Sequence, residues 1–139
     1  SLINNCNKLW KKQTTSEVEN KLHNSGVLPH VIILEFHDED SKTTRNRETS
    51  FVIKGAKYSL DSCIVRDTFK GHVCAMLTCE KKEYAYDGAS FRPFVPFDWK
   101  KKINSKSYWG FGGVLRAEGV PLKWSFMDGY NMLIYYRIE

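Results

Sequence analysis

The sequence lacks the features of a membrane or secreted protein. No apolar run approaches the roughly 18 residues that a membrane-spanning helix requires, and residues 1–13 (SLINNCNKLWKKQ) have no continuous apolar centre like that of a secretory signal peptide. We therefore expect no contact with a membrane.

No two cysteines have C-x-x-C spacing, so neither a zinc knuckle nor a dithiol redox centre is indicated.

Cysteine is scarce, with four residues at Cys6, Cys63, Cys74 and Cys79. The last three stand inside apolar, strand-like runs, where a reduced cysteine packs as a small hydrophobic side chain. We expect these three to be buried free thiols. A protein with free thiols is typical of a reducing intracellular compartment, here the cytoplasm or the nucleus.

Histidine is also sparse and forms no metal-binding pattern. His23, His30 and His37 recur every seven residues, but the expected structure changes from helix to loop to strand across them. Residues on different kinds of element do not share one face, so we expect no metal site. We expect no other cofactor either.

What the sequence does contain is the composition of a globular domain. Its 139 residues are 42% hydrophobic and 14% aromatic, which is enough for one domain with a sizeable core. The chain begins with Ser1 and not Met, so we expect a piece of a longer protein.

The charge of the chain is mildly basic. The net charge of +5 comes from 21 basic and 16 acidic residues that are dispersed, which is more typical of a solvated surface than of a nucleic-acid site. A nucleic-acid-binding domain that uses the FDWKKK stretch with Trp109 and Phe111 remains an alternative.

Residues 1–27 are expected to form an N-terminal helical segment. Apolar residues recur at helical spacing over residues 2–12. Ser16 and Glu19 then have the spacing of a capping box, before a second short helix that stops at Gly26. The hydrophobic pattern changes after this glycine.

Residues 28–139 are expected to form a sheet of five or six mostly antiparallel strands. The run VLPHVIILEFHD is apolar at both alternating sets of positions and predicts a strand buried on both sides. Two strands are expected in residues 50–68, a hairpin in residues 71–90 with Lys81 and Lys82 in its turn, and a last strand in residues 129–139. Short connections exclude a doubly wound βαβ fold, so the predicted class is α+β.

Residues 91–106 are expected to form an ordered loop. Phe91, Phe94 and Phe97 recur between prolines, which indicates a loop pinned to the core or, if the rings are exposed, a docking patch for a partner. Trp99 is expected to cap the core, and Lys100 to Lys102 to form a solvated edge.

The predicted hairpin carries a histidine and an aspartate that suit catalysis. His72 begins its first strand and Asp87 ends its second. A carboxylate that accepts a hydrogen bond from one imidazole nitrogen leaves the other nitrogen able to take a proton from a nucleophile. With the turn at Lys81 and Lys82, His72 would face a residue near 91, so contact would need a longer turn or a bulge. The alternative is an ordinary strand-end histidine with a surface partner.

Around this pair the chain resembles the C-terminal, palm half of the ubiquitin-specific proteases, which are papain-like cysteine peptidases. The similar stretches, between Leu28 and Ile138, are LPHVIILEF, YSLDSCIVRD, GHV, EYAYDG and MLIYYR. In that family the histidine of a Gly-His-Tyr motif is the general base, and the first aspartate of a Phe-Asp-Asp stretch orients it. The resemblance therefore implies that His72 is the general base and Asp87 the orienting acid.

The nucleophilic cysteine of the family is not recognisable here. In the family it lies in a Gly-x-Thr-Cys-type box at the start of a helix, well over a hundred residues before the histidine. Only about seventy residues precede His72 in this chain. Cys6 is the one upstream candidate, but its spacing with apolar neighbours places it on the buried face of a helix. The chain also departs from the family at Arg66, Val73 and Gly88, which concerns recognition of the substrate tail more than the fold.

The sequence thus predicts a ubiquitin-specific-protease-like domain, in a non-catalytic or incomplete form that binds ubiquitin, a ubiquitin-like protein or another protein partner. The first alternative is an active deubiquitinating cysteine protease whose nucleophile is Cys6 or lies outside this chain. The second alternative is the basic nucleic-acid-binding domain.

Overall fold

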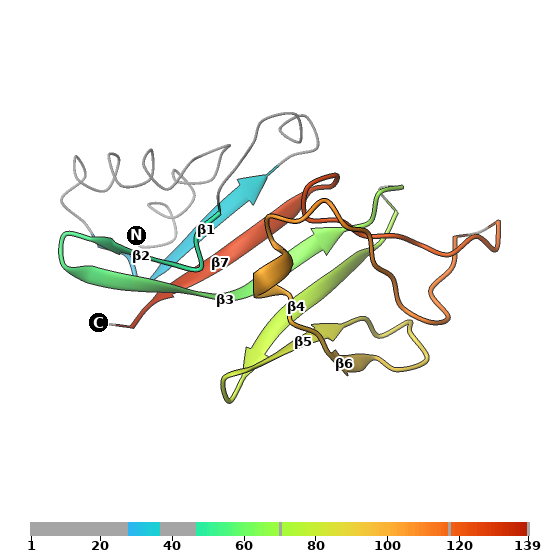
Figure 1. The fold of residues 1–139 in the computed structure, drawn as a ribbon, viewed down its shortest axis with the longest axis horizontal. Coiled ribbons are helices and arrows are strands. Elements are labelled where there is room, and N and C mark those ends of the chain that lie inside the picture. The colour runs from blue at the N-terminus through green and yellow to red at the C-terminus, as the bar shows by residue number, and fades with distance from the viewer. Residues whose placement is uncertain (1–27, 37–46, 70, 117, 139) are drawn as a thin grey trace.

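A computed structural model describes residues 28–36, 47–69, 71–116 and 118–138. In this part of the chain seven strands form one sheet (Figure 1). The strands are β1 (Val31–Phe36), β2 (Ser50–Ile53), β3 (Ala56–Arg66), β4 (Val73–Cys79), β5 (Lys82–Tyr86), β6 (Phe94–Pro96) and β7 (Asn131–Arg137). Their order is β1-β7-β3-β4-β5-β6, with β2 paired to β3 beside that path, and every pairing is antiparallel.

The predicted α+β class is wrong for the residues that the structure describes. Their regular structure is almost entirely one antiparallel sheet, and their one helical element is the three-residue 3-10 turn η2 (Lys100–Lys102). Strands prevail because β-branched and aromatic residues fill short runs, and two pairs of these runs are joined by two-residue turns. The helices predicted within residues 1–27 lie outside the described residues and do not enter the observed class. No helix in the described ranges is long and apolar enough to cross a membrane.

The strand that the sequence did not predict is β6. Its surroundings contain prolines, which favour a loop, but β6 is at the edge of the sheet, where a proline needs no partner for the N–H that it lacks. Pro96 lies opposite Tyr84, and Phe94 lies opposite Tyr86. The rings of Tyr84 and Phe94 stack with their centroids 4.3 Å apart. The loop that follows Asp87 is therefore joined to the sheet through β5.

Two tight turns set the register of the hairpins. Lys54 and Gly55 join β2 to β3 with φ of 48° and 81°, and Glu80 and Lys81 join β4 to β5 with φ of 49° and 64°. Two consecutive residues with positive φ form a type I′ turn, whose twist matches that of antiparallel strands. The predicted turn at Lys81 and Lys82 is wrong by one residue, because Lys82 is already the first residue of β5.

One face of the sheet, the core face, is covered by residues 97–116 and 118–128. Figure 1 shows this segment crossing β3 and β4. It contributes to the same buried cluster as alternate strand residues, through Trp99, Ile103, Val114, Leu122, Trp124 and Phe126. The prediction that Trp99 caps the core is confirmed, because its side chain is fully buried and its Nε1 donates to the Leu77 carbonyl at 3.1 Å.

The opposite face, the reverse face, is also rich in apolar side chains. By strand alternation it holds the partly exposed residues Val31, Ile33, Ile64, Val73, Leu77, Tyr84, Tyr86, Met132, Ile134 and Tyr136. In β1 the residues alternate between partly exposed and buried along the whole strand. The prediction that this strand is buried on both sides is therefore wrong.

The three phenylalanines of residues 91–97 have different surroundings. Phe97 packs against the core cluster, whereas Phe91 is 85% exposed and Phe94 is 49% exposed. The Phe91 N–H donates to the Gly112 carbonyl at 2.8 Å, and a Cβ added to Gly113 would lie 2.8 Å from the Phe91 ring. The loop is thus anchored through its backbone and Phe97, while the Phe91 ring stays on the surface.

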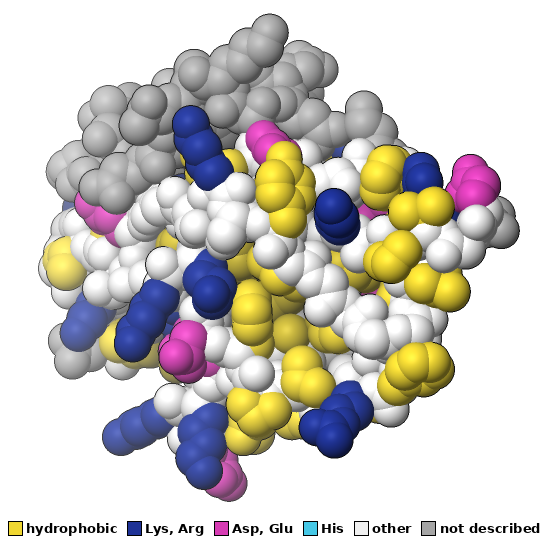
Figure 2. Space-filling model, turned by 45° about the vertical axis from the view of Figure 1, so that its right-hand side comes forward, with side chains coloured by type: hydrophobic (Ala, Val, Ile, Leu, Met, Phe, Trp, Pro, Cys, Tyr) yellow, Lys and Arg dark blue, Asp and Glu magenta, His cyan; other side chains and the backbone are white. Residues whose placement is uncertain are grey.

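The surface drawn in Figure 2 has a hollow lined with hydrophobic side chains. Lys and Arg side chains lie scattered around this hollow, with Asp and Glu among them. Trp109 and Phe111, the aromatic residues of the nucleic-acid alternative, pack against each other and against Trp124. Both rings are partly buried against the core cluster.

Candidate functional site

The pairing of β4 with β5 decides where His72 and Asp87 lie. Ala75 lies opposite Tyr86 at the end of this ladder, so the same register carried outward places His72 opposite residue 89. Asp87 is therefore two positions from direct opposition, and not four as the predicted turn implies. Both residues belong to the core face by alternation, and diagonal neighbours on one face lie within reach of long side chains.

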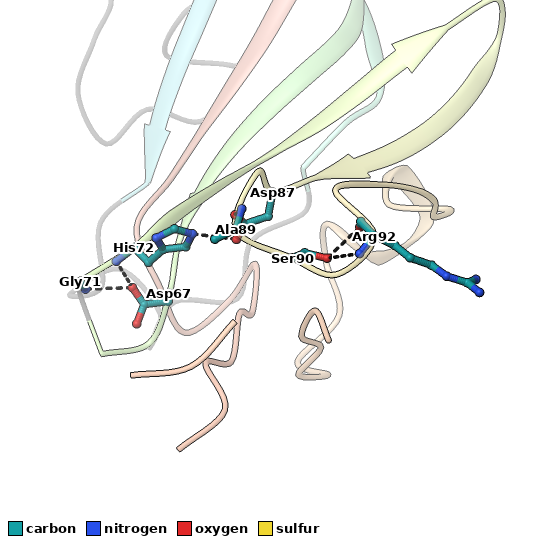
Figure 3. A network of polar contacts seen from close by, with 7 residues as sticks. All are labelled: Asp67, Gly71, His72, Asp87, Ala89, Ser90 and Arg92. Atoms are coloured by element: carbon teal, nitrogen blue, oxygen red, sulfur yellow. Dashed lines mark hydrogen bonds and ion pairs between the residues drawn. The ribbon is translucent and has the colours of Figure 1, made fainter. Parts of the chain in front are cut away.

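His72 and Asp87 are in direct contact (Figure 3). His72 Nε2 lies 2.7 Å from Asp87 Oδ2. The Asp87 side chain is 3% exposed and the His72 side chain is 34% exposed. A contact this short between an imidazole and a buried carboxylate is a charge-assisted hydrogen bond. The longer turn or bulge that the predicted register required is not needed, since the turn at Glu80 and Lys81 already brings the pair together.

Asp87 is oriented by bonds other than the one to His72. Its Oδ1 accepts a hydrogen bond from the Ala89 N–H at 2.9 Å, and its own N–H donates to the Pro93 carbonyl at 2.8 Å. The Ser90 N–H donates to the Asp87 carbonyl at 3.1 Å. The turn after β5 thus uses one carboxylate oxygen for the backbone and directs the other toward the imidazole.

The contact decides which nitrogen of His72 is available for chemistry. An ionised carboxylate only accepts hydrogen bonds, so Nε2 is the protonated nitrogen of the neutral ring and Nδ1 carries the lone pair. No residue in the described ranges provides a hydrogen-bond partner for Nδ1. The imidazole is therefore arranged to accept a proton at Nδ1.

The ring of the buried residue Trp124 packs beside the imidazole of His72. The Trp124 ring lies at an angle of 67° to the His72 ring, with their centroids 6.0 Å apart. Trp124 is fully buried and stacks on Trp109 with a centroid distance of 5.6 Å. This packing limits the space into which the His72 ring can turn.

Asp67 is a second buried acid beside His72, and the sequence prediction missed it. Its side chain is 1% exposed. Oδ1 accepts hydrogen bonds from the N–H groups of Gly71 at 2.8 Å and His72 at 2.5 Å (Figure 3), and Oδ2 accepts one from the Phe69 N–H at 2.8 Å. The stretch DTFKG carried a signal, because an aspartate at the start of a turn often bonds the backbone N–H groups that follow it.

No cysteine within the described ranges is placed to act as the nucleophile for His72. Cys63 and Cys74 are buried, and burial raises the pKa of Cys63 to about 12 and also raises the pKa of Cys74. Cys79 is exposed, contrary to the prediction, because it ends β4 on the reverse face. Seven strand positions separate it from His72, on the order of 20 Å. Cys6 lies outside the described residues.

The positions where the chain departs from the family motif lie near the pair. Val73 follows His72 but belongs to the reverse face, where it lies opposite Arg66 at the end of the β3–β4 ladder. The Arg66 guanidinium lies over the Tyr130 ring, 5.3 Å from its centroid. By alternation, neither Val73 nor Arg66 is on the side of the sheet that holds the pair. Gly88 directly follows Asp87, and a Cβ there would lie 3.3 Å from the Tyr86 hydroxyl.

Metal-ligating side chains do not gather in the described part of the chain. It contains no group of three His, Cys, Asp or Glu side chains that could hold an ion. Of the histidines with seven-residue spacing, His23 and His37 lie outside the described residues. His30 Nδ1 lies 3.2 Å from a guanidinium nitrogen of Arg137.

No protein-family model matches the chain, and no curated protein matches it in sequence. The case for a function therefore rests on the geometry of the site and on the motifs in the sequence.

Proposed function

We propose that this chain is a ubiquitin-specific-protease-like domain whose catalytic machinery is incomplete in the described residues, and which binds ubiquitin, a ubiquitin-like protein or another protein partner. The observation that carries the proposal is the 2.7 Å contact between His72 Nε2 and Asp87 Oδ2, which leaves Nδ1 available. The sequence motifs around the pair resemble the same family in the same order. The described cysteines are buried or distant, so we propose binding and not hydrolysis by this chain alone.

The pair can perform one half of thiol chemistry. His72 Nδ1 would take the proton from a cysteine thiol, which leaves a thiolate nucleophile and an imidazolium. The Asp87 carboxylate would stabilise the imidazolium through the bond to Nε2–H. The proton on Nδ1 would later pass to the leaving amine. His72 therefore suits general-base and general-acid steps, and Asp87 suits orientation and charge stabilisation.

Exposed apolar side chains around the pair support a protein partner. Phe69, Phe91 and Leu115 are 48%, 85% and 54% exposed. Phe69 lies in the loop before His72, Phe91 in the loop after Asp87, and Leu115 in the loop that follows Gly112 and Gly113. The Arg116 guanidinium lies 3.9 Å from the centroid of the Phe69 ring, which joins the first and third of these loops. Exposed apolar side chains grouped around one site are typical of protein interaction surfaces.

One observation favours the second candidate, an active deubiquitinating protease whose nucleophile is Cys6 or lies outside this chain. Asp87 is almost fully buried, and both of its oxygens are hydrogen-bonded, one of them to His72. Burial of a carboxylate is costly unless it is paired in this way. The contact that marks the site in the first candidate is also the geometry that a general base requires, so it fits hydrolysis once a cysteine thiol is supplied.

Intact-mass labelling with ubiquitin that carries a C-terminal thiol-reactive group tests whether Cys6 is the nucleophile of an active protease. The chain would be compared with His72→Ala and Cys6→Ser, and His30→Ala is the matched control because His30 is an exposed histidine away from the pair. Cys79→Ser is included because Cys79 is exposed and open to nonspecific alkylation.

A stoichiometric adduct that is lost in both His72→Ala and Cys6→Ser would establish the active protease. No adduct, together with saturable calorimetric binding of ubiquitin or a ubiquitin-like protein, supports the incomplete form. Neither adduct nor binding by the folded chain would contradict both the recognition of ubiquitin or a ubiquitin-like protein and an active site built on Cys6. Binding to a single-stranded oligonucleotide that weakens steeply with salt would favour the nucleic-acid alternative.

A further inference from the structure

We propose that Asp67 is a positioning residue for His72: it fixes the main chain of the histidine, while Asp87 fixes its ring. The use of this positioning in catalysis or recognition rests on the proposed function. The contacts that support it, and the experiment that tests it, concern the chain alone.

Asp67 holds both backbone polar groups of His72. Its Oδ1 accepts a hydrogen bond from the His72 N–H at 2.5 Å, and its own N–H donates to the His72 carbonyl at 2.8 Å. The same Oδ1 accepts a hydrogen bond from the Gly71 N–H at 2.8 Å. One residue therefore fixes the histidine main chain on both sides of its Cα.

The Asp67 carboxylate is buried, and both of its oxygens are used. Three backbone N–H groups donate to it, two to Oδ1 and one from Phe69 to Oδ2. Hydrogen bonds to an ionised carboxylate are roughly twice as strong as those between neutral groups. A carboxylate that is 1% exposed would be costly without such partners, so these bonds keep the start of β4 in one conformation.

The same loop has anchors that do not touch His72. The Thr68 N–H donates to the Lys123 carbonyl at 2.9 Å, and the Arg116 guanidinium lies over the Phe69 ring. Arg116→Gln would therefore loosen the loop without removing a bond to His72. It is the matched control that separates positioning from general stability.

Asp67→Asn keeps the size of the side chain and removes one acceptor. If the asparagine oxygen keeps the bonds to Gly71 and His72, its NH2 group faces the Phe69 N–H. In the opposite orientation the NH2 group faces the His72 N–H. A donor faces a donor in both cases, so the loop must shift. Asp67→Ser is a second variant that keeps one short acceptor.

The test is a long-range 1H–15N correlation spectrum of the histidine side chains in the 15N-labelled chain, with His72 assigned from a His72→Gln variant. The wild type is expected to show the neutral ring of His72 as a single Nε2–H tautomer. Asp67→Asn is expected to show a mixture of both tautomers, with amide exchange at Gly71 and His72 about tenfold faster. Arg116→Gln is expected to keep the wild-type tautomer.

A folded Asp67→Asn variant that keeps the single tautomer would overturn the proposal, and so would an equal tautomer mixture in Arg116→Gln. If Asp67→Asn does not fold, Asp67→Ser is measured in the same way. Failure of both variants to fold would assign Asp67 to general stability and would also overturn the proposal. Because these spectra need no ubiquitin, their outcome is separate from the presence or absence of ubiquitin binding.

Discussion

Replacing Asp87 with asparagine removes the charge in the His72 contact and leaves the size of the side chain unchanged. In the wild type one carboxylate oxygen accepts from His72 Nε2 at 2.7 Å, and the other accepts from the Ala89 N–H at 2.9 Å. Asparagine has a single oxygen, so its NH2 group must face one of these two donors.

The expected loss is about 2 kcal/mol of unfolding free energy. A hydrogen bond to a charged group contributes ~1.5–3 kcal/mol, and the lower end applies because a third of the His72 side chain is exposed and solvent screens the pair. Two such bonds give ~3 kcal/mol, and the one neutral bond that asparagine keeps offsets ~1 kcal/mol of this.

Urea denaturation followed by tryptophan fluorescence measures this loss. With a denaturant dependence of about 2 kcal/mol per molar, the midpoint is expected to fall by about 1 M. Ser90→Ala is the control, since within the described residues its hydroxyl bonds the exposed backbone of Arg92 in the same loop and no other group, and it should change stability by less than about 0.5 kcal/mol. An Asp87→Asn midpoint equal to that of Ser90→Ala would refute the claim that the pair forms in solution.

Gly129→Ala is expected to lower the melting temperature by several degrees, because a Cβ there would lie 2.9 Å from the Arg66 carbonyl; an unchanged melting curve would contradict this packing. Cys79 is expected to react with a chromogenic thiol reagent in the native chain, while Cys63 reacts only on unfolding, because Cys63 is fully buried; equal native rates would show the burial to be wrong. Burial raises the pKa of Cys63 from 9.0 to about 12, so its contribution to stability is full below pH 9 and is lost as the pH rises toward 12. Cys63→Ala should show a smaller loss of stability over that pH range in urea titrations, and an equal loss would remove Cys63 as the cause.

The contact between His72 and Asp87 could be anticipated from the sequence because both residues belong to one hairpin. Pairing of neighbouring strands depends on alternation and on the turn between them, and both are visible in a local pattern. The turn was misplaced by one residue because Glu80 and Lys81 adopt positive φ, where glycine and asparagine are the usual residues. The error changed the register but left the strands paired.

Contacts from distant or irregular segments could not be predicted in this way. Trp124 packs beside His72 from a segment far along the chain, and no periodic pattern connects the two. The role of Asp67 depends on the directions of backbone N–H groups in an irregular turn. The α+β class failed because the helical patterns lie in residues 1–27, whereas the described residues build a sheet.

The type I′ turn between β4 and β5 sets the register of the two strands, and the register sets the distance between His72 and Asp87 at the other end of the hairpin. Glu80→Asn with Lys81→Gly would supply the residues that this turn prefers and would lock the observed register. The same Asn-Gly pair moved one position on, at residues 81 and 82, would slide β5 by two residues, or roughly 7 Å, while every side chain kept its face. His72 and Asp87 would then be separated without a change to either. Substitutions in the turn can therefore form or break the contact between His72 and Asp87 from the opposite end of the hairpin.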